Sequence, residues 1–505
     1  MPTTPRDIAL PVGAVALAGA FGVLVAVAGP KLAAIGLAIP FVAWAAFRIA
    51  IVIAGHPLRL IEGVAAFSLI IVSAPNVLPN SAFKVVALAP FVVALAFMDA
   101  RRRVDRLSLY VLSAYVGLLV IALFRGASAE AWGSLASAVI TGSTIVAVAA
   151  FGVKLFTSAA DEADRRRRLM ALAVAPGLFA VANIAAYAIG DRLPLIVIPQ
   201  STSIAAGTPA SILNAIGFGG AVRVQLPLTG GVNAMGATAA VGIIVAGVMV
   251  RQTKGWVRIG HLSLGLACLV SAVLTDSRTA VLFAIFLLIL ALVTPRLKGA
   301  KGFALLLPLS PLITVAALGA FANSQLSQSL SRNGNDFATG TGRSFIWQAI
   351  WENTLSKVDP IHLIGYGANG QVTSGASPYY AFVFGNQEGT FTAHDVYLQM
   401  VLDIGYVGLA AMVAAAYLAF GRLRTAPGPG PALGWGIFAI LLTGITESMP
   451  APYALDVLTL FILLLAAESA VIGSWSAPPG AKHRAVQSDS HGESFARPPR
   501  APMRD

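Results

Sequence analysis

Apolar runs that are long enough to cross a lipid bilayer follow one another along almost the whole chain. A membrane-spanning helix needs about 20 mostly apolar residues, and about 14 such runs can be placed. They cover residues 8–28, 32–54, 60–78, 82–98, 107–124, 132–156, 169–190, 232–250, 259–275, 279–295, 302–322, 397–420, 432–447 and 453–473. Hydrophobic residues make up 57% of the sequence and charged residues 11%, whereas a soluble domain carries about 25% charged residues. We therefore expect an all-α, polytopic membrane protein with about 12–14 transmembrane helices.

Basic residues cluster at every second connection between these runs, which indicates the orientation of the chain. The clusters fall at residues 101–106, 165–168, 251–258, 296–301 and 422–424. Cytoplasmic loops of membrane proteins are enriched in Lys and Arg, so both termini are expected in the cytoplasm. The net charge of +12 is then a signal of topology and not of nucleic-acid binding.

Two substantial segments interrupt the apolar pattern on the opposite, external side, the first semi-apolar and rich in Pro, Gly and Ser and the second polar. They are residues 191–231 and, between two late runs, residues 323–397. The chain then divides into residues 1–322 with about 11 spans, the external loop 323–397, residues 398–473 with about three spans, and residues 474–505. This last segment has too little apolar content to fold, and we expect a disordered cytoplasmic tail.

The long external loop has some local order of its own. Apolar residues recur at helical spacing over residues 344–355, which predicts an amphipathic helix on the membrane surface. Trp347 and Trp351 on this helix suit the headgroup layer. The following Gly365-Tyr366-Gly367-Ala368-Asn369-Gly370 predicts a turn or a close approach of two backbones.

Three arginines stand at membrane edges on the external side, where the topology rule disfavours them: Arg223, Arg278 and Arg343. Ionisable groups at such a depth usually face a cavity. A guanidinium matches phosphate oxygens in a bidentate way, so several of them converging would suit a lipid diphosphate. The alternative for each is an interfacial side chain that reaches for water or pairs with an acid, such as Asp276 for Arg278.

His394 stands where the external loop meets the next apolar run. An imidazole there can take a proton from a sugar hydroxyl. Asp395 could hold its tautomer, although neighbours in sequence need not face each other. The alternative is that the pair only begins the next helix, with Asp395 as its N-terminal charge.

Metal and nucleotide chemistry are not indicated by the sequence. The external acids are scattered and contain no Asp-x-Asp pair for Mg²⁺ or Mn²⁺. The glycine-rich loop with Lys-Ser/Thr that cradles nucleotide phosphates is missing. The single cysteine, Cys268, can form neither an intrachain disulfide nor, by itself, a thiolate metal site.

Taken in order, several short motifs resemble those of the O-antigen ligase and repeat-unit polymerase superfamily. They are Ser277-Arg278-Thr279-Ala280, Gly342-Arg343 with Ile346-Trp347, Gly365-Tyr366-Gly367, His394-Asp395-Val396-Tyr397-Leu398 and Asp403-Ile404-Gly405-Tyr406-Val407-Gly408-Leu409. The resemblance covers roughly residues 215–420. The chain also resembles this family in its long external loop, which lies between two late spans and ends in a histidine motif. At the position of Asp395 the family more often shows Asn.

The resemblance implies a GT-C-type fold and a metal-independent transfer of a glycan from undecaprenyl diphosphate to a sugar hydroxyl, either in polymerisation of repeat units or in ligation. It implies that Arg278 and Arg343 bind the diphosphate and that His394 activates the acceptor, with no cofactor. We expect substrate contacts also from Arg223, Asp395, Trp347 and Tyr366. Partners would include a flippase and a chain-length regulator. The alternative is a transporter of lipid-linked glycans, for which internal repeats and broken helices would be typical.

Overall fold

The computed structural model describes residues 59–73, 88–99, 104–189, 210, 212, 222–293, 343–381, 392–426, 428–452 and 454–467. These ranges contain helices and no β-strand. The apolar helices are α3 (Arg59–Ser73), α5 (Ala89–Ala96), α6 (Arg106–Ser128), α7 (Leu135–Thr157), α8 (Glu162–Ile189), α10 (Val232–Gln252), α11 (Gly255–Leu274), α12 (Arg278–Val293), α19 (Val396–Leu423), α20 (Gly430–Thr443) and α21 (Leu455–Ala466). Short helices lie between α12 and α19: α16 (Arg343–Ile350), a π-helical turn (Trp351–Leu355), a 3₁₀ turn (Pro360–Leu363), α17 (Gly370–Thr373) and α18 (Pro378–Ala381).

The expected all-α polytopic membrane protein is confirmed. Six of the described helices are long and apolar enough to cross a membrane, and four further apolar helices are shorter. Every expected span that falls within the described ranges contains a helix. The expected spans 8–28, 32–54 and 302–322, residues 323–342 of the loop and the tail 474–505 lie outside the described residues, so the total of spans stays a prediction.

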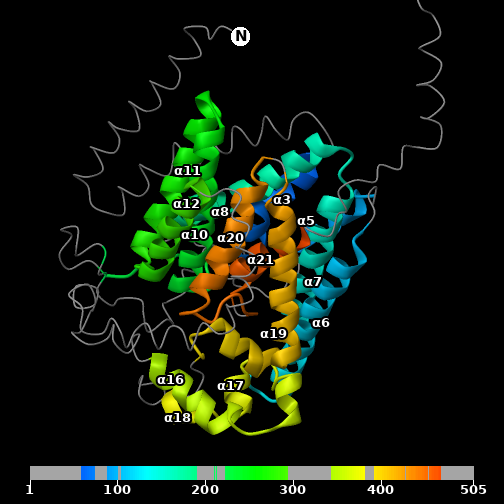
Figure 1. The fold of residues 1–505 in the computed structure, drawn as a ribbon, viewed down its shortest axis with the longest axis vertical. Coiled ribbons are helices and arrows are strands. Elements are labelled where there is room, and N and C mark those ends of the chain that lie inside the picture. Colours follow the sequence, from blue (N-terminus) through cyan, green and yellow to red (C-terminus); the bar gives the residue numbers. More distant parts are fainter. Residues whose placement is uncertain are drawn as a thin grey trace, which may run out of the picture.

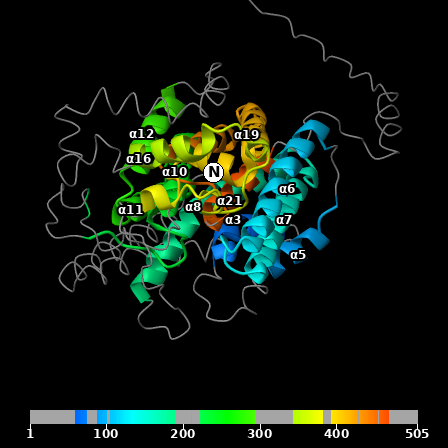
Figure 2. The same ribbon diagram turned by 90° about the horizontal axis from the view of Figure 1, so that it is seen from below.

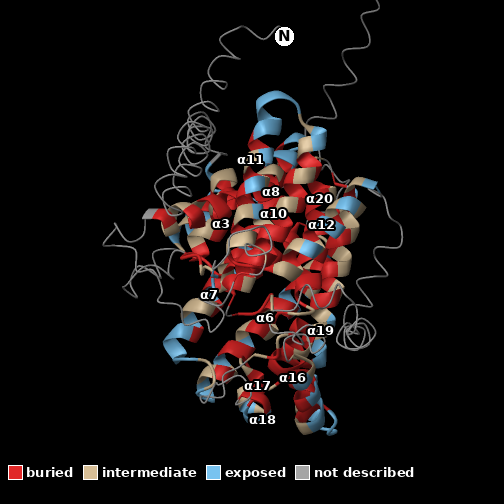
Figure 3. Ribbon diagram, turned by 90° about the vertical axis from the view of Figure 1, so that its left-hand side faces the viewer, coloured by how far each residue is buried: buried red, intermediate tan, exposed pale blue. Residues whose placement is uncertain are grey.

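The helices pack side by side into one bundle (Figure 1), in which α10 packs against α8, α11, α12 and α20. In α10 83% of the span is buried against other helices, whereas the buried share of the span is 39% in α6, α7 and α11. Small residues on α10 allow this, because a Cβ at Gly236 would lie 2.4 Å from Cβ of Ser277 and one at Gly242 would lie 2.3 Å from Sγ of Cys268. Buried residues fill the interior of the bundle (Figure 3), and most of them are apolar.

The basic clusters that the structure describes gather at one end of the bundle. Arg167 at the start of α8 pairs with Glu62 of α3, and Arg422 at the end of α19 pairs with Asp105 before α6. The cluster at residues 165–168, which precedes the expected span 169–190, is part of α8, because this helix already begins at Glu162. Acidic Glu162 and Asp164 in the first turn explain the earlier start, because they favour a helix N-terminus and pair with these arginines.

The loop helices form a cap at the opposite end of the bundle, together with the first part of α19 (Figures 1 and 2). Helix α19 bends at Gly405, whose φ of 73° and ψ of −179° are not helical. At this bend the backbone of Gly365–Gly367 crosses that of α19: Tyr366 N–H donates to Leu402 O at 2.6 Å and Gly367 N–H to Asp403 O at 3.1 Å. The close backbone approach expected at Gly365-Tyr366-Gly367 is therefore confirmed.

The amphipathic helix expected at residues 344–355 is present as α16 and its π-helical turn. Trp351 is 56% exposed, but Trp347 is only 5% exposed, and its Nε1–H donates to Ala393 O at 3.0 Å. The headgroup position expected for Trp347 is therefore wrong. The apolar face of α16 packs against Tyr380 of α18 and Leu402 of α19, because the cap offers that face a protein surface to bury against.

Candidate functional site

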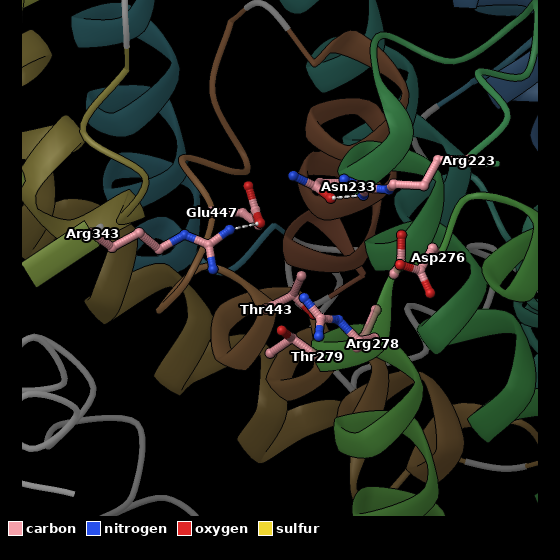
Figure 4. Close-up of a pocket in the computed structure, with 10 residues that line it drawn as sticks. Arg223, Asn233, Asp276, Arg278, Thr279, Arg343, Thr443 and Glu447 are labelled. Carbon is pink, nitrogen blue, oxygen red and sulfur yellow. Dashed lines mark hydrogen bonds and ion pairs between the residues drawn. The ribbon is translucent and has the colours of Figure 1, made fainter. Parts of the chain in front are cut away.

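A pocket lies between the cap and the end of the bundle, and all three arginines singled out in the sequence reach it (Figure 4). Its lining consists of Arg223, Asn233, Asp276, Ser277, Arg278, Thr279, Ala280, Arg343, Thr443 and Glu447. These residues come from the segment before α10, from α10 itself, from the α11–α12 link and the start of α12, from α16 and from the end of α20 with the loop after it. Three guanidinium groups therefore face two carboxylates in one small space.

Arg223 is held by backbone and amide oxygens. Its Nε donates to Thr275 O at 3.0 Å and its Nη2 to Asn233 Oδ1 at 3.1 Å. The side chain is only 7% exposed. Its segment is tied to the bundle by the hydrogen bond from Val224 N to Leu274 O. A buried arginine in such a fixed position can present its guanidinium to an anion without first having to be ordered.

Arg278 is the first residue of α12 and follows a tight link from α11. Asp276 in this link has a φ of 48°, and its Oδ1 accepts a hydrogen bond from Ile212 N at 2.9 Å. Ser277 Oγ donates to Val232 O at 2.9 Å, which fixes the link to α10. The N-terminus of a helix carries partial positive charge, so α12 adds to the attraction of Arg278 for anions.

Arg343, at the start of α16, forms a short ion pair with Glu447 through Nη2 and Oε1. The other oxygen of the same carboxylate, Oε2, lies 3.4 Å from Nδ1 of His394. Burial raises the pKa of Glu447, but the charges of Arg343, His394 and Arg223 outweigh this and hold that pKa below its ordinary value of 4.5. Glu447 is therefore an ionised carboxylate shared between a guanidinium and an imidazole.

His394 is fixed in place by the residues around it. Its φ of 49° is left-handed, a conformation that costs free energy and needs support from its neighbours. Ala393 supplies that support, since its N–H donates to Gln399 Oε1 at 3.0 Å and its carbonyl accepts from Trp347. On the other side, Val396 N–H donates to Gly444 O at 2.7 Å. These contacts hold His394 against the loop that carries Glu447.

Asp395 has a different place from the one that its sequence position suggested. Its Oδ1 accepts hydrogen bonds from the N–H groups of Tyr397 and Leu398, at 2.8 and 2.9 Å, as the N-cap of α19. It is fully buried, and burial raises its pKa to about 8. The carboxylate on the His394 imidazole is therefore Glu447, while Asp395 takes the role of helix cap, the alternative that the sequence left open.

The other two expected contact residues belong to the packing of the cap. The hydroxyl of Tyr366 lies 3.0 Å from Nε2 of His362, and burial followed by the charge of Asp359 raises the pKa of this tyrosine. Trp347 supports Ala393, one residue before the histidine. Neither Tyr366, Trp347 nor Asp395 lines the pocket. Direct substrate contacts by these three residues stay predictions.

A comparison with known protein families found a match for part of the chain. Residues 263–413 match the family described as O-antigen ligase. This match supports the resemblance of the chain to the O-antigen ligase and polymerase superfamily. Searches among curated proteins and among solved structures found no match.

The O-antigen ligase domain contains Arg278, Arg343 and His394, but the pocket also depends on residues outside it. Arg223 comes from before the matched region and Glu447 from after it. Sequence reasoning missed Glu447, Asn233 and Thr443. The signal for Glu447 was an acid at the external end of the span 432–447. In the ranges that the structure describes, no group of three or more His, Cys, Asp or Glu could hold a metal ion; independence from metals stays a prediction.

Proposed function

We propose that this integral membrane protein is a glycosyltransferase that moves a glycan from an undecaprenyl diphosphate-linked donor to a sugar hydroxyl at the outer face of the inner membrane. The observation that carries the proposal is the convergence of Arg223, Arg278 and Arg343 on one pocket that is joined to His394 through Glu447. The O-antigen ligase domain supports a reaction of this type.

In the proposed reaction, the acceptor hydroxyl attacks the anomeric carbon of the donor. Its proton passes to Nε2 of His394, since Nδ1 of that ring faces Glu447. As the new C–O bond forms, the bond from the anomeric carbon to the diphosphate oxygen breaks, and its electron pair stays on that oxygen. The arginines of the pocket stabilise the charge that develops there, and stabilisation of this kind usually contributes more to catalysis than any other single effect. His394 then returns its proton to water.

The test is glycan transfer by the purified full-length chain in lipid nanodiscs supplied with a lipid-linked glycan and an acceptor. His394→Ala and Arg343→Ala should each abolish transfer while the protein remains inserted and folded. Full activity of either variant would remove that residue from the mechanism. Movement of the lipid-linked glycan across the bilayer without any new glycosidic bond would instead identify a transporter and refute the proposal.

Polymerisation of repeat units and ligation of a finished glycan would use the same chemistry, so cells must separate them. Loss of a polymerase leaves single repeats on the lipid carrier or the acceptor. Loss of a ligase leaves long chains on the lipid carrier. The glycan profile of a deletion strain therefore assigns the reaction. A flippase would supply the donor, and a chain-length regulator would be a partner if the reaction is polymerisation.

A further inference from the structure

Glu447 contacts two groups that have different roles in the proposed reaction, since Arg343 binds the diphosphate and His394 accepts the proton. Its Oε1 binds the guanidinium of Arg343 and its Oε2 lies 3.4 Å from the imidazole of His394. The side chain of this carboxylate is only 9% exposed, whereas those of Arg343 and His394 are 18% and 23% exposed. The two partners are therefore more accessible to a ligand than the carboxylate that they share.

A diphosphate in this pocket must compete with Glu447 for Arg343. Phosphate oxygens and a carboxylate seek the same bidentate face of a guanidinium. When Arg343 turns to the phosphate, the buried carboxylate loses its short ion pair. A buried charge without a partner is costly, so Glu447 must draw closer to its other neighbour, Nδ1 of His394. The 3.4 Å distance is long for a hydrogen bond and leaves room for this change.

We infer that Glu447 is a positioning residue that couples donor binding to activation of the base. This inference rests on the proposed function and assigns to Glu447 a regulatory part in it. Without donor, Glu447 binds mainly Arg343, and at 3.4 Å it lies too far from His394 for a strong hydrogen bond. With donor, Glu447 is committed to His394, stabilises its protonated ring and fixes the tautomer that carries a lone pair on Nε2.

The coupling protects the activated donor from a premature reaction with water. Glu447 closes on His394 only when a diphosphate occupies Arg343. The charged groups that face Glu447 are Arg343, His394 and, further away, Arg223. Arg278 and Asp276 complete the charged lining of the pocket. Among these groups only His394 has an ordinary pKa between pH 5 and 8. Burial raises the pKa of the neighbouring Asp395 to about 8, so the pH profile is measured in the Asp395→Asn background, where it reports on the base.

The test compares Glu447→Gln with the unchanged protein in two separate measurements. The first is binding of undecaprenyl diphosphate to the full-length chain in nanodiscs. Without the competing carboxylate, Arg343 should bind undecaprenyl diphosphate more tightly. The gain is about tenfold if the Arg343–Glu447 ion pair contributes about 1.4 kcal/mol. A residue that merely maintained the fold would weaken binding when it is replaced.

The second measurement is turnover as a function of pH. Glu447→Gln should lower turnover about 10²-fold, within the range that general bases contribute. The acidic limb of the profile should move to lower pH, because an imidazole without its carboxylate releases its proton more readily. Glu447→Asp keeps the charge and should recover part of the turnover together with the original limb.

Controls separate a failure of this inference from a failure of the proposed function. Glu352→Gln makes the same chemical change at an exposed position of the cap and should leave both measurements unchanged. Labelling of the buried Cys268 by a thiol-reactive dye during heating shows whether each variant is folded. An active wild type whose Glu447→Gln variant binds undecaprenyl diphosphate more weakly, or keeps the position of the acidic limb, overturns the coupling alone. A wild type that transfers no glycan overturns the proposed function and the coupling with it.

Discussion

Replacing Gly405 by alanine should detach the cap from the bundle, because two backbones cross there without room for a side chain. Gly405 has a φ of 73° and a ψ of −179°, a region essentially restricted to glycine that costs other residues about 1–3 kcal/mol. A Cβ at this position would lie 2.3 Å from C and O of Leu363 and 2.4 Å from N of Ile364. These are backbone atoms, which cannot turn aside as a flexible side chain can. Overpacking of this kind costs about 1–3 kcal/mol more.

Backbone strain and overpacking together predict a loss of about 2–6 kcal/mol at the joint between cap and bundle. Even about 2 kcal/mol multiplies the opened fraction roughly 30-fold. Lys357 is exposed in the cap, so the rate of tryptic cleavage after this residue, followed by mass spectrometry on the nanodisc protein, measures the opening when opening and closing are fast. Glycan transfer should fall in parallel, since α19 begins two residues after His394.

Gly117→Ala is the matched control. Gly117 lies inside α6, and no heavy atom stands within 4 Å of a Cβ built there. Alanine is about 0.5–1 kcal/mol more favourable than glycine inside a helix, so cleavage after Lys357 should not increase. Cleavage of Gly405→Ala at the wild-type rate, with undiminished transfer, would refute the view that this crossing holds the cap over the pocket.

Three further predictions concern the pocket and its surroundings. Arg278→Lys should lower transfer about 10²-fold in the nanodisc assay, because an ammonium cannot replace a bidentate fork; near-normal transfer would show that only the charge matters. EDTA should leave transfer unchanged, and strong inhibition that Mg²⁺ reverses would contradict the metal-independent scheme. Asp395→Asn keeps an oxygen for the helix cap and should retain transfer. Because burial raises the pKa of Asp395 to about 8, folding takes up a proton between about pH 4 and 8 and stability falls as pH rises through that range; melting curves of Asp395→Asn should lose this fall.

The features that sequence could predict are those encoded locally. Each transmembrane run depends on its own apolar residues, and every expected span in the described ranges contains a helix. The unusual positions of Arg223, Arg278 and Arg343 were also visible, because an arginine at a membrane edge stands out against an apolar background. Their convergence on one pocket followed from the predicted topology, which put all three on the same side.

The features that sequence could not predict are those that depend on contacts between distant segments. Glu447 is 53 residues from His394 and 104 from Arg343, and nothing in its own neighbourhood distinguishes it from other acids near the ends of spans. The misplacement of Trp347 has a related cause. An amphipathic pattern shows that a helix has an apolar face, but it does not show whether lipid or protein covers that face.

The composition of the pocket argues for function because it does not serve stability. Three guanidinium groups that share one lining repel each other, and two of their neighbours, Asp276 and Glu447, are buried carboxylates that lose hydration. Replacing such buried charges by apolar side chains of similar size is often neutral or stabilising. An apolar bundle of this kind would fold as well or better without them. The excess of positive charge is therefore best explained by an anionic substrate, and the shared carboxylate of Glu447 by the need to hold Arg343 and His394 ready until that substrate arrives.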